Sequence, residues 1–324
     1  RFTDLGPRGT HNATIDWGDG TGVVDGTVVE LPTTVAGSVV GSHVYADDGQ
    51  YTVTVTVTDY EGLWHSDKLT VTVANVAPTV DAIDQTVNES VAGSPTELTT
   101  VSLDPATFTD PGFDNSLNVG GEVEETFTYS IDWGDGTDPD TGDASIDGVG
   151  GPGVLTRGSV AGSHQYEDDG EYFVTVTVTD DDGGVGSHTF TVTVLNVAPA
   201  VTVNNPNVDP VQYSDPIADI TISAKDIAAD KMTIDLDLPD AGTIAGGLAL
   251  TTVTSTGGSA EWRITGIADL EPGKYEIVAT VTDDELRSTE VSIFLTVAKE
   301  DTVATYVGPT FVSAQADGHF PFAV

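Results

Sequence analysis

Apolar and polar residues alternate with a period of two along several stretches of this chain. Residues 51–58 read YTVTVTVT, and residues 172–179 read YFVTVTVT. In a β-strand this spacing places the valines on one face and the threonines on the other. The pattern therefore predicts two strands that each bury one face and expose the other.

Each of these strands is followed by another alternating run, and the last third of the chain contains one as well. Residues 69–73, 190–194 and 293–297 carry apolar side chains at every second position. The Asp-rich connections 59–67 and 180–186 have the composition of hairpin turns. No segment has a helical period. Many short antiparallel strands with one buried face predict an all-β fold made of β-sandwiches.

The chain repeats itself over a domain-sized interval, with IDWGDGT at 15–21 and again at 131–137. Three further pairs of motifs recur: GSHVY at 41–45 with GSHQY at 162–166, DDGQY at 47–51 with DDGEY at 168–172, and NVAP at 75–78 with 196–199. A degenerate third copy has TIDLD at 233–237 and GKY at 273–275. A repeat of this size indicates whole domains in tandem rather than a solenoid.

These repeats define the expected domain organisation. Three domains are predicted at 1–74, 75–195 and 196–298, and residues 299–324 look like the start of an incomplete further domain or a tail. The first domain begins only one residue before its FTD motif, whereas the second has about thirty residues before its own. We therefore expect the first domain to lack its first strand.

The motifs resemble those of the PKD domain, an immunoglobulin-like sandwich. Its hallmarks are a WGDG loop, a His-x-Tyr segment, a Gly-x-Tyr strand of alternating valines that ends in Asp, and a closing Asn-x-x-Pro. The resemblance covers residues 2–78 and 108–199, while 200–298 resembles a divergent cadherin-like or immunoglobulin-like module. It implies a repeat region of a large secreted bacterial or archaeal surface protein, and it implies no catalysis.

The net charge of the chain limits the classes of molecule that it can bind. The 52 acidic and 10 basic residues give a formal net charge of −42. Such a chain is repelled by nucleic acid and by anionic membrane surfaces, and it attracts cations, above all calcium. A solvated acidic surface explains the same composition without any bound ion. Cysteine is absent, which excludes disulfides and thiol nucleophiles.

The resemblance also implies calcium ligands, because some PKD domains bind calcium through the WGDG loop, the Asp that ends the long strand and the first segment of the domain. The matching residues of the second domain are Asp132, Asp135, Asp180 and Asn75. Those of the first domain are Asp16, Asp19 and Asp59, and those of the third are Asp235, Asp237 and Asp283. The segment 138–143 is a second, weaker candidate that loosely echoes a calcium-binding loop.

Catalysis has little support in the sequence. Turn aspartates are normally solvated, and a hydrolytic pair needs a cleft and one perturbed acid. His43 and His164 each stand without a Ser or Cys partner, which favours a hydrogen-bonded structural role. The chain is therefore predicted not to be an enzyme.

Two functions remain open. The first is a structural or adhesive spacer of a secreted or cell-surface protein, stabilised by calcium and part of a filament or matrix, with neighbouring domains or copies of itself as partners. The second is a polysaccharide-binding accessory region of a secreted hydrolase. The strand-like segment 302–312 could complete the open first domain of another copy, whereas a plain fragment of a longer chain needs no such exchange.

Overall fold

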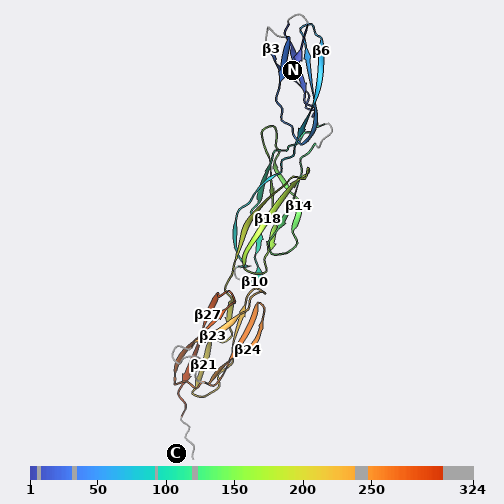
Figure 1. Ribbon diagram of the computed structural model, residues 1–324. Coiled ribbons are helices and arrows are strands. Elements are labelled where there is room, and N and C mark those ends of the chain that lie inside the picture. The colour runs from blue at the N-terminus through green and yellow to red at the C-terminus, as the bar shows by residue number, and fades with distance from the viewer. Residues whose placement is uncertain (6–8, 31–34, 92–93, 119–122, 238–246, 302–324) are drawn as a thin grey trace, which may run out of the picture. The chain divides into compact units, whose positions relative to one another are not determined.

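The computed structural model describes residues 1–5, 9–30, 35–91, 94–118, 123–237 and 247–301 (Figure 1). Every regular element in these ranges is a β-strand, which confirms the predicted all-β, immunoglobulin-like sandwich class. Contacts group the chain into two compact units. Unit 1 holds Arg1–Val87 with Thr100–Leu195, and unit 2 holds Asn88–Thr99 with the chain from Asn196 onward.

The first sandwich of unit 1 is built from six strands. They run in the order β1 (Phe2–Thr3), β4 (Ala36–Val40), β3 (Val23–Glu30), β2 (Asn12–Asp16), β5 (Gly49–Thr58) and β6 (Trp64–Val73). β3 joins the two layers, because its first half pairs with β2 and its second half pairs with β4. The alternation in β5 buries Tyr51 and Val53, as the sequence predicts.

The second sandwich, also in unit 1, has two main sheets. One runs β15 (Ser145–Gly148), β16 (Thr156–Val160), β12 (Ala106–Asp110), β7 (Thr79–Asp81). The other runs β14 (Asp140–Asp143), β13 (Phe127–Asp132), β18 (Gly170–Asp180), β19 (Val185–Leu195), β8 (Gln85–Asn88). A short pair, β11 (Thr100–Ser102) with β17 (Ser163–Gln165), completes it. Val174, Val176 and Val178 of β18 are fully buried in its core.

Unit 2 holds the third sandwich and a hairpin of β9 (Ser90–Val91) and β10 (Ser94–Leu98). One sheet runs β20 (Ala200–Val203), β22 (Ile220–Lys225), β25 (Ser259–Gly266), β24 (Leu248–Thr256). The other runs β21 (Asn207–Gln212), β27 (Ser288–Ala298), β26 (Gly273–Thr282), β23 (Thr233–Asp237). Trp262 and the alternating apolar residues of β26 and β27 form the core.

Candidate cation site

The WGDG loops use their aspartates to hold the backbone. Asp132 accepts a hydrogen bond from the Gly134 amide at 3.0 Å, as Asp16 does from Gly18 at 3.0 Å. Asp135 accepts bonds from the amide and hydroxyl of Thr137, and its second oxygen lies 2.6 Å from His164 Nε2. These are the bonds of side chains that stabilise a turn.

Asp19 repeats this arrangement with Thr21 and His43, whose Nε2 lies 2.7 Å from the carboxylate. Burial acts to raise the pKa of Asp19, but the bonds from Thr21 and His43 outweigh it, and the net pKa is lowered. The same balance lowers the pKa of Asp135. Both histidines are therefore hydrogen-bonded structural residues, as the sequence predicts.

The predicted ligands of one shared ion lie at opposite ends of the second sandwich. In the β13–β18 pair, Asp132 is opposite Thr175, whereas Asp180 is opposite Phe127. Five residues of strand separate the two positions, which corresponds to about 17 Å. Ligands of one calcium ion lie at 2.3–2.6 Å from it, so the grouping of Asp132 and Asp135 with Asp180 is corrected.

The first sandwich repeats this separation. Asp16 is opposite Thr54, whereas Asn12, at the other end of β2, is opposite Thr58 beside Asp59. Asp16 and Asp19 therefore lie away from Asp59, which instead accepts backbone bonds from Glu61 and Leu63 in its own turn. Most of the weaker candidate, 138–143, forms the edge strand β14 and not a loop, and the Asp140 carboxylate accepts a bond from Trp133 Nε1 at 2.9 Å.

One predicted pair does come together. The Asn75 amide donates to both carboxylate oxygens of Asp180 at 3.0 Å, and the Gly184 amide donates to Asp180 at 2.6 Å. This pair lies at the same end of the second sandwich as the turn between β18 and β19.

Two acids that the sequence analysis did not single out lie at this end as well. Asp110, which ends β12, is only 2% exposed, and its Oδ2 has no hydrogen-bond partner among the described residues. Burial, together with Asp180 and Asp181, raises the pKa of Asp110 to about 6. Burial and the charges of Asp181, Asp110 and Asp47 raise the pKa of Glu125 to about 8.

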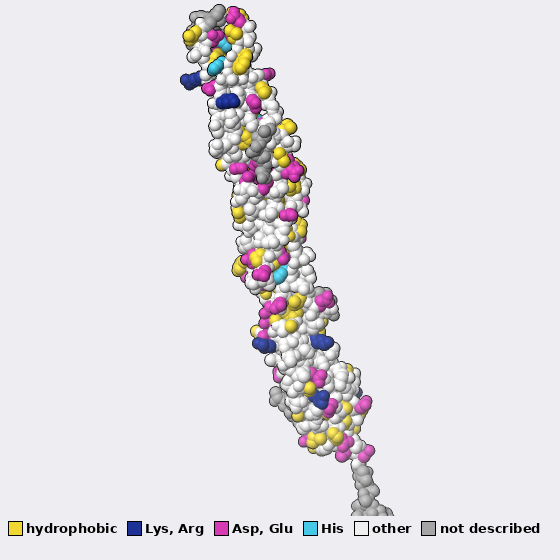
Figure 2. All heavy atoms as spheres, turned by 90° about the vertical axis from the view of Figure 1, so that its right-hand side faces the viewer, with side chains coloured by type: hydrophobic (Ala, Val, Ile, Leu, Met, Phe, Trp, Pro, Cys, Tyr) yellow, Lys and Arg dark blue, Asp and Glu magenta, His cyan; other side chains and the backbone are white. Residues whose placement is uncertain are grey.

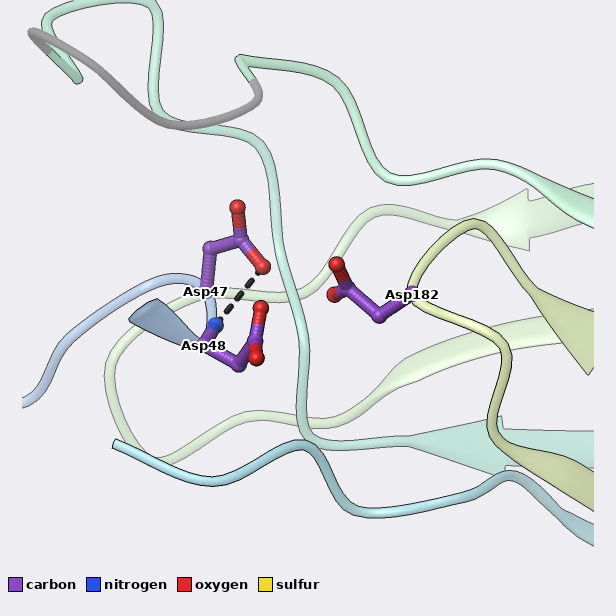
Figure 3. A group of neighbouring side chains, drawn as sticks. All are labelled: Asp47, Asp48 and Asp182. Atoms are coloured by element: carbon purple, nitrogen blue, oxygen red, sulfur yellow. Dashed lines mark hydrogen bonds between the residues drawn. The ribbon is translucent and has the colours of Figure 1, made fainter. Parts of the chain in front are cut away.

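The turn before β5 adds a third group of acids within unit 1. Figure 3 shows Asp182, on the β18–β19 turn, facing Asp47 and Asp48. One ligand oxygen from each lies within 4.8 Å of the other two. Burial, the hydrogen bonds with Asp47 and Asp48, and their charges raise the pKa of Asp182 to about 7.

We call Asp47, Asp48, Asp110, Glu125 and Asp182 the unit 1 acidic cluster. All five line a cavity of about 110 Å³, together with Asn75. Several carboxylates so close to one another cannot all be ionised without a compensating positive charge. Hard oxygen ligands that converge in this way suit calcium, which takes six to eight of them.

The sequence contained a partial signal for this cluster. The FTD motif at 108–110 and the Asp pair at 47–48 both recur in the repeat, but nothing in the sequence indicates that their acids lie close together. Only the tertiary structure brings the end of β12, the segment around Glu125 and two turns to one cavity.

Comparison with known proteins leaves the family unassigned. No family model matches the chain, and no curated protein matches it in sequence. The PKD resemblance therefore remains a prediction from the motifs.

Many solved structures match at low similarity. The BIgI domain of beta protein from S. agalactiae is 20% identical, with a TM-score of 0.25, over 32% of this chain and 99% of that one. Domains z1z2 of titin are 12% identical, with a TM-score of 0.32, over 70% and 100% of the two chains. Mouse cadherin-23 EC22-24 is 15% identical, with a TM-score of 0.28, over 92% and 90%. Similarities this low say nothing about what this chain binds.

Among the described residues, no helix is long and apolar enough to cross a membrane.

Proposed function

We propose that this chain is a non-catalytic structural or adhesive segment of an extracellular or cell-surface protein, stabilised by calcium. Its partners are neighbouring domains and copies of the same protein, in a filament or matrix. The observation that carries the proposal is the unit 1 acidic cluster, where five carboxyl groups line one small cavity.

The size of this cavity argues for an ion rather than a substrate. At about 110 Å³ it is well below the roughly 300–1,000 Å³ of pockets that bind small molecules. Asp110, Glu125 and Asp182 also have pKa values raised together by burial and by neighbouring acids. A hydrolytic pair needs one raised acid beside one stably ionised partner and room for a sugar ring.

Calcium removal tests the proposal on the full chain. Unfolding is followed by calorimetry in excess calcium and in excess chelator, and calcium is expected to raise the melting temperature of unit 1 because it binds only the folded cluster. In the double variant Glu125→Gln, Asp182→Asn most of that shift is expected to disappear. The matched control Asp143→Asn, Asp147→Asn removes two exposed acids of the same sandwich and should keep the shift.

An unchanged melt of unit 1 in chelator would overturn the calcium part of the proposal. Self-association is tested separately by sedimentation of the full chain at increasing concentration, with and without calcium. A chain that stays monomeric throughout would argue against copies of itself as partners.

The polysaccharide alternative has one observation in its favour. Trp64 is 69% exposed and lines an open cavity of about 610 Å³ in the first sandwich. Exposed aromatic rings can stack on sugars. Saturable binding of a soluble polysaccharide that is lost in Trp64→Ala but kept in the Glu125→Gln, Asp182→Asn variant would favour this function.

A further inference from the structure

A second group of acids lies inside unit 2, at one end of the third sandwich. Asp226 directly follows β22, Asp230 lies four residues later, and Asp283 directly follows β26. Their exposed fractions are only 1%, 1% and 3%. One ligand oxygen from each lies within 4.8 Å of the other two.

The hydrogen bonds of this group leave one oxygen of each carboxylate without a partner among the described residues. Asp226 Oδ1 accepts a bond from the Ile227 amide at 3.0 Å, and Asp283 Oδ1 accepts one from the Arg287 amide at 2.7 Å. The Oδ2 atom of each of the three aspartates is buried and has no hydrogen-bond partner among the described residues. Buried polar atoms are normally paired, and an unpaired buried carboxylate is especially costly.

The backbone around these acids is fixed. The Asp226 amide donates to the Gly258 carbonyl at 3.1 Å, and the Gly258 amide donates to the Asp230 carbonyl at 3.0 Å. Both bonds tie the loop that carries Asp226 and Asp230 to the turn between β24 and β25. The fold therefore holds the carboxylates close together, because separating them would break these backbone hydrogen bonds.

These three carboxylates have no basic side chain paired with them among the described residues. Within the described part of the chain, no Lys or Arg forms an ion pair with Asp226, Asp230 or Asp283. Burial and the surrounding acids, Asp226 and Glu89 foremost, raise the pKa of Asp230 to about 8, and burial with the charge of Asp283 raises the pKa of Asp226 to about 6. Buried carboxylates are stable in their ionised form only when a positive charge lies next to them.

We propose that Asp226, Asp230 and Asp283 form a buried calcium site inside the third sandwich. Calcium fits better than magnesium, because magnesium usually keeps several of its waters and these carboxylates are almost closed to solvent. The site is separate from the unit 1 acidic cluster, so either one can exist without the other.

The structure also corrects the ligand set that the sequence indicated for this domain. Asp283 keeps its place, but Asp235 and Asp237 are exposed on β23. They are opposite Thr280 and Val278, in the strand that precedes Asp283. Asp226 and Asp230 take their place, and Asp235 and Asp237 become matched controls.

The experiment uses the full chain and two readouts. Hydrogen exchange by mass spectrometry reports protection in peptides that contain β22 and β26, in excess calcium and in excess chelator. Calcium titration by calorimetry counts the sites. The wild type is expected to gain protection in both strands with calcium, because the ion binds only the folded arrangement.

The variant Asp226→Asn, Asp230→Asn should lose this gain, with an affinity at this site at least about tenfold lower, as changes at metal sites typically cause. Because it removes repulsion, it should also be better protected in chelator than the wild type, which shows that it folds. Asp235→Asn, Asp237→Asn should behave as wild type.

Three outcomes would overturn the proposal: no effect of calcium on these peptides, an unaltered gain in Asp226→Asn, Asp230→Asn, or an equal loss in the control. The Glu125→Gln, Asp182→Asn variant of unit 1 should keep the calcium effect in β22 and β26. Failure of the unit 1 cluster and failure of this site are therefore distinguishable.

Discussion

At the scale of single residues, the repeated motifs build one aromatic stack in each of the first two sandwiches. Trp133 stacks on His164 with ring centroids 5.0 Å apart, and Tyr166 stacks on Tyr172 at 3.9 Å. Tyr166 also donates to the Trp133 carbonyl, while Asp135 holds His164. The first sandwich repeats the stack with Trp17, His43, Tyr45 and Tyr51. The aspartates of the WGDG motif, which the sequence indicated as metal ligands, therefore help to anchor this loop to the core.

Two glycines of this loop share a left-handed backbone conformation but differ in the space available for a side chain. Gly134 and Gly136 have φ values of +79° and +86°, but a Cβ on Gly134 would lie 2.5 Å from the Phe173 carbonyl oxygen, whereas one on Gly136 would meet nothing within 4 Å. Gly136→Ala should cost about 1–2 kcal/mol, the price of a left-handed conformation. Gly134→Ala should cost clearly more, as measured by denaturant unfolding of the full chain. Equal losses would show that the close approach does not matter.

His11 gives a prediction about pH. Its Nδ1 lies 2.7 Å from Glu30 and its Nε2 lies 3.0 Å from Asp4. Burial acts to lower the pKa of His11, but these two carboxylates outweigh it and raise the pKa above 6.5. A raised histidine pKa stabilises the fold fully below the unfolded-state value, and this contribution is lost as the pH rises through the folded-state value. The stability difference between wild type and His11→Gln should therefore be largest below pH 6.5 and shrink in alkaline buffer. A difference that does not vary with pH would contradict this.

At the scale of elements, the first two sandwiches differ in the strand partners of β12 and of its counterpart β1. β12 pairs with β16 on one side and with β7 on the other, where Phe108 is opposite Val80. β1, its counterpart, pairs within the described residues only with β4. At the β7 position the first sandwich has the 610 Å³ cavity, lined by Phe2, Val55 and Val57. These valines are only partly buried, whereas their counterparts Val176 and Val178 are fully buried.

A peptide with the sequence of residues 76–84, VAPTVDAID, should therefore bind the first sandwich. It should add a strand beside β1 by main-chain hydrogen bonds and place the valine equivalent to Val80 in the cavity. We expect a change in the fluorescence of Trp64, which lines the cavity, and a higher melting temperature of the first sandwich. The same peptide with aspartate at the position of Val80 is the control.

Binding of both peptides alike, or of neither, would contradict this account of the cavity. The other proposed donor, residues 302–312, lies outside the described residues.

The sequence predicted these elements better than it predicted the site. Alternating valines fix the strand and its buried face together, because the side-chain period of a strand is two. Whether acidic side chains come together depends instead on how loops that follow distant strands pack against one another. Glu125, Asp226 and Asp230 are single acids in irregular segments, and no local pattern marks them. Asp110 belongs to the repeated FTD motif, but the motif does not show which other acids it meets. The grouping of Asp132 with Asp180 was wrong because it followed the family pattern without the strand register. In the antiparallel pair Asp132 lies at the end of β13, whereas Asp180 lies opposite its first residue, Phe127.

At the scale of the whole molecule, the acidic residues divide into two populations. Most of the 52 acids are exposed, and Figure 2 shows them scattered over the visible face with few basic side chains between them. A few are buried, as are Asp110 and Glu125 of the unit 1 acidic cluster and the group of Asp226, Asp230 and Asp283. Exposed charges repel one another over distances that salt screens, whereas buried groups are screened much less.

This division predicts different responses to sodium and calcium. In chelator, sodium chloride should raise the melting temperature of the full chain gradually and without saturation, because the screening length falls from about 30 Å at 0.01 M to about 10 Å at 0.1 M. Calcium should act at concentrations that hardly change the ionic strength, and its effect should saturate because it fills a fixed number of sites. Calorimetry at matched ionic strengths separates the two effects, and magnesium serves as the control for divalent charge alone. If calcium shifts the melt no more than sodium chloride of equal ionic strength, the buried acids bind no specific ion and the acidity of the chain acts only through its surface.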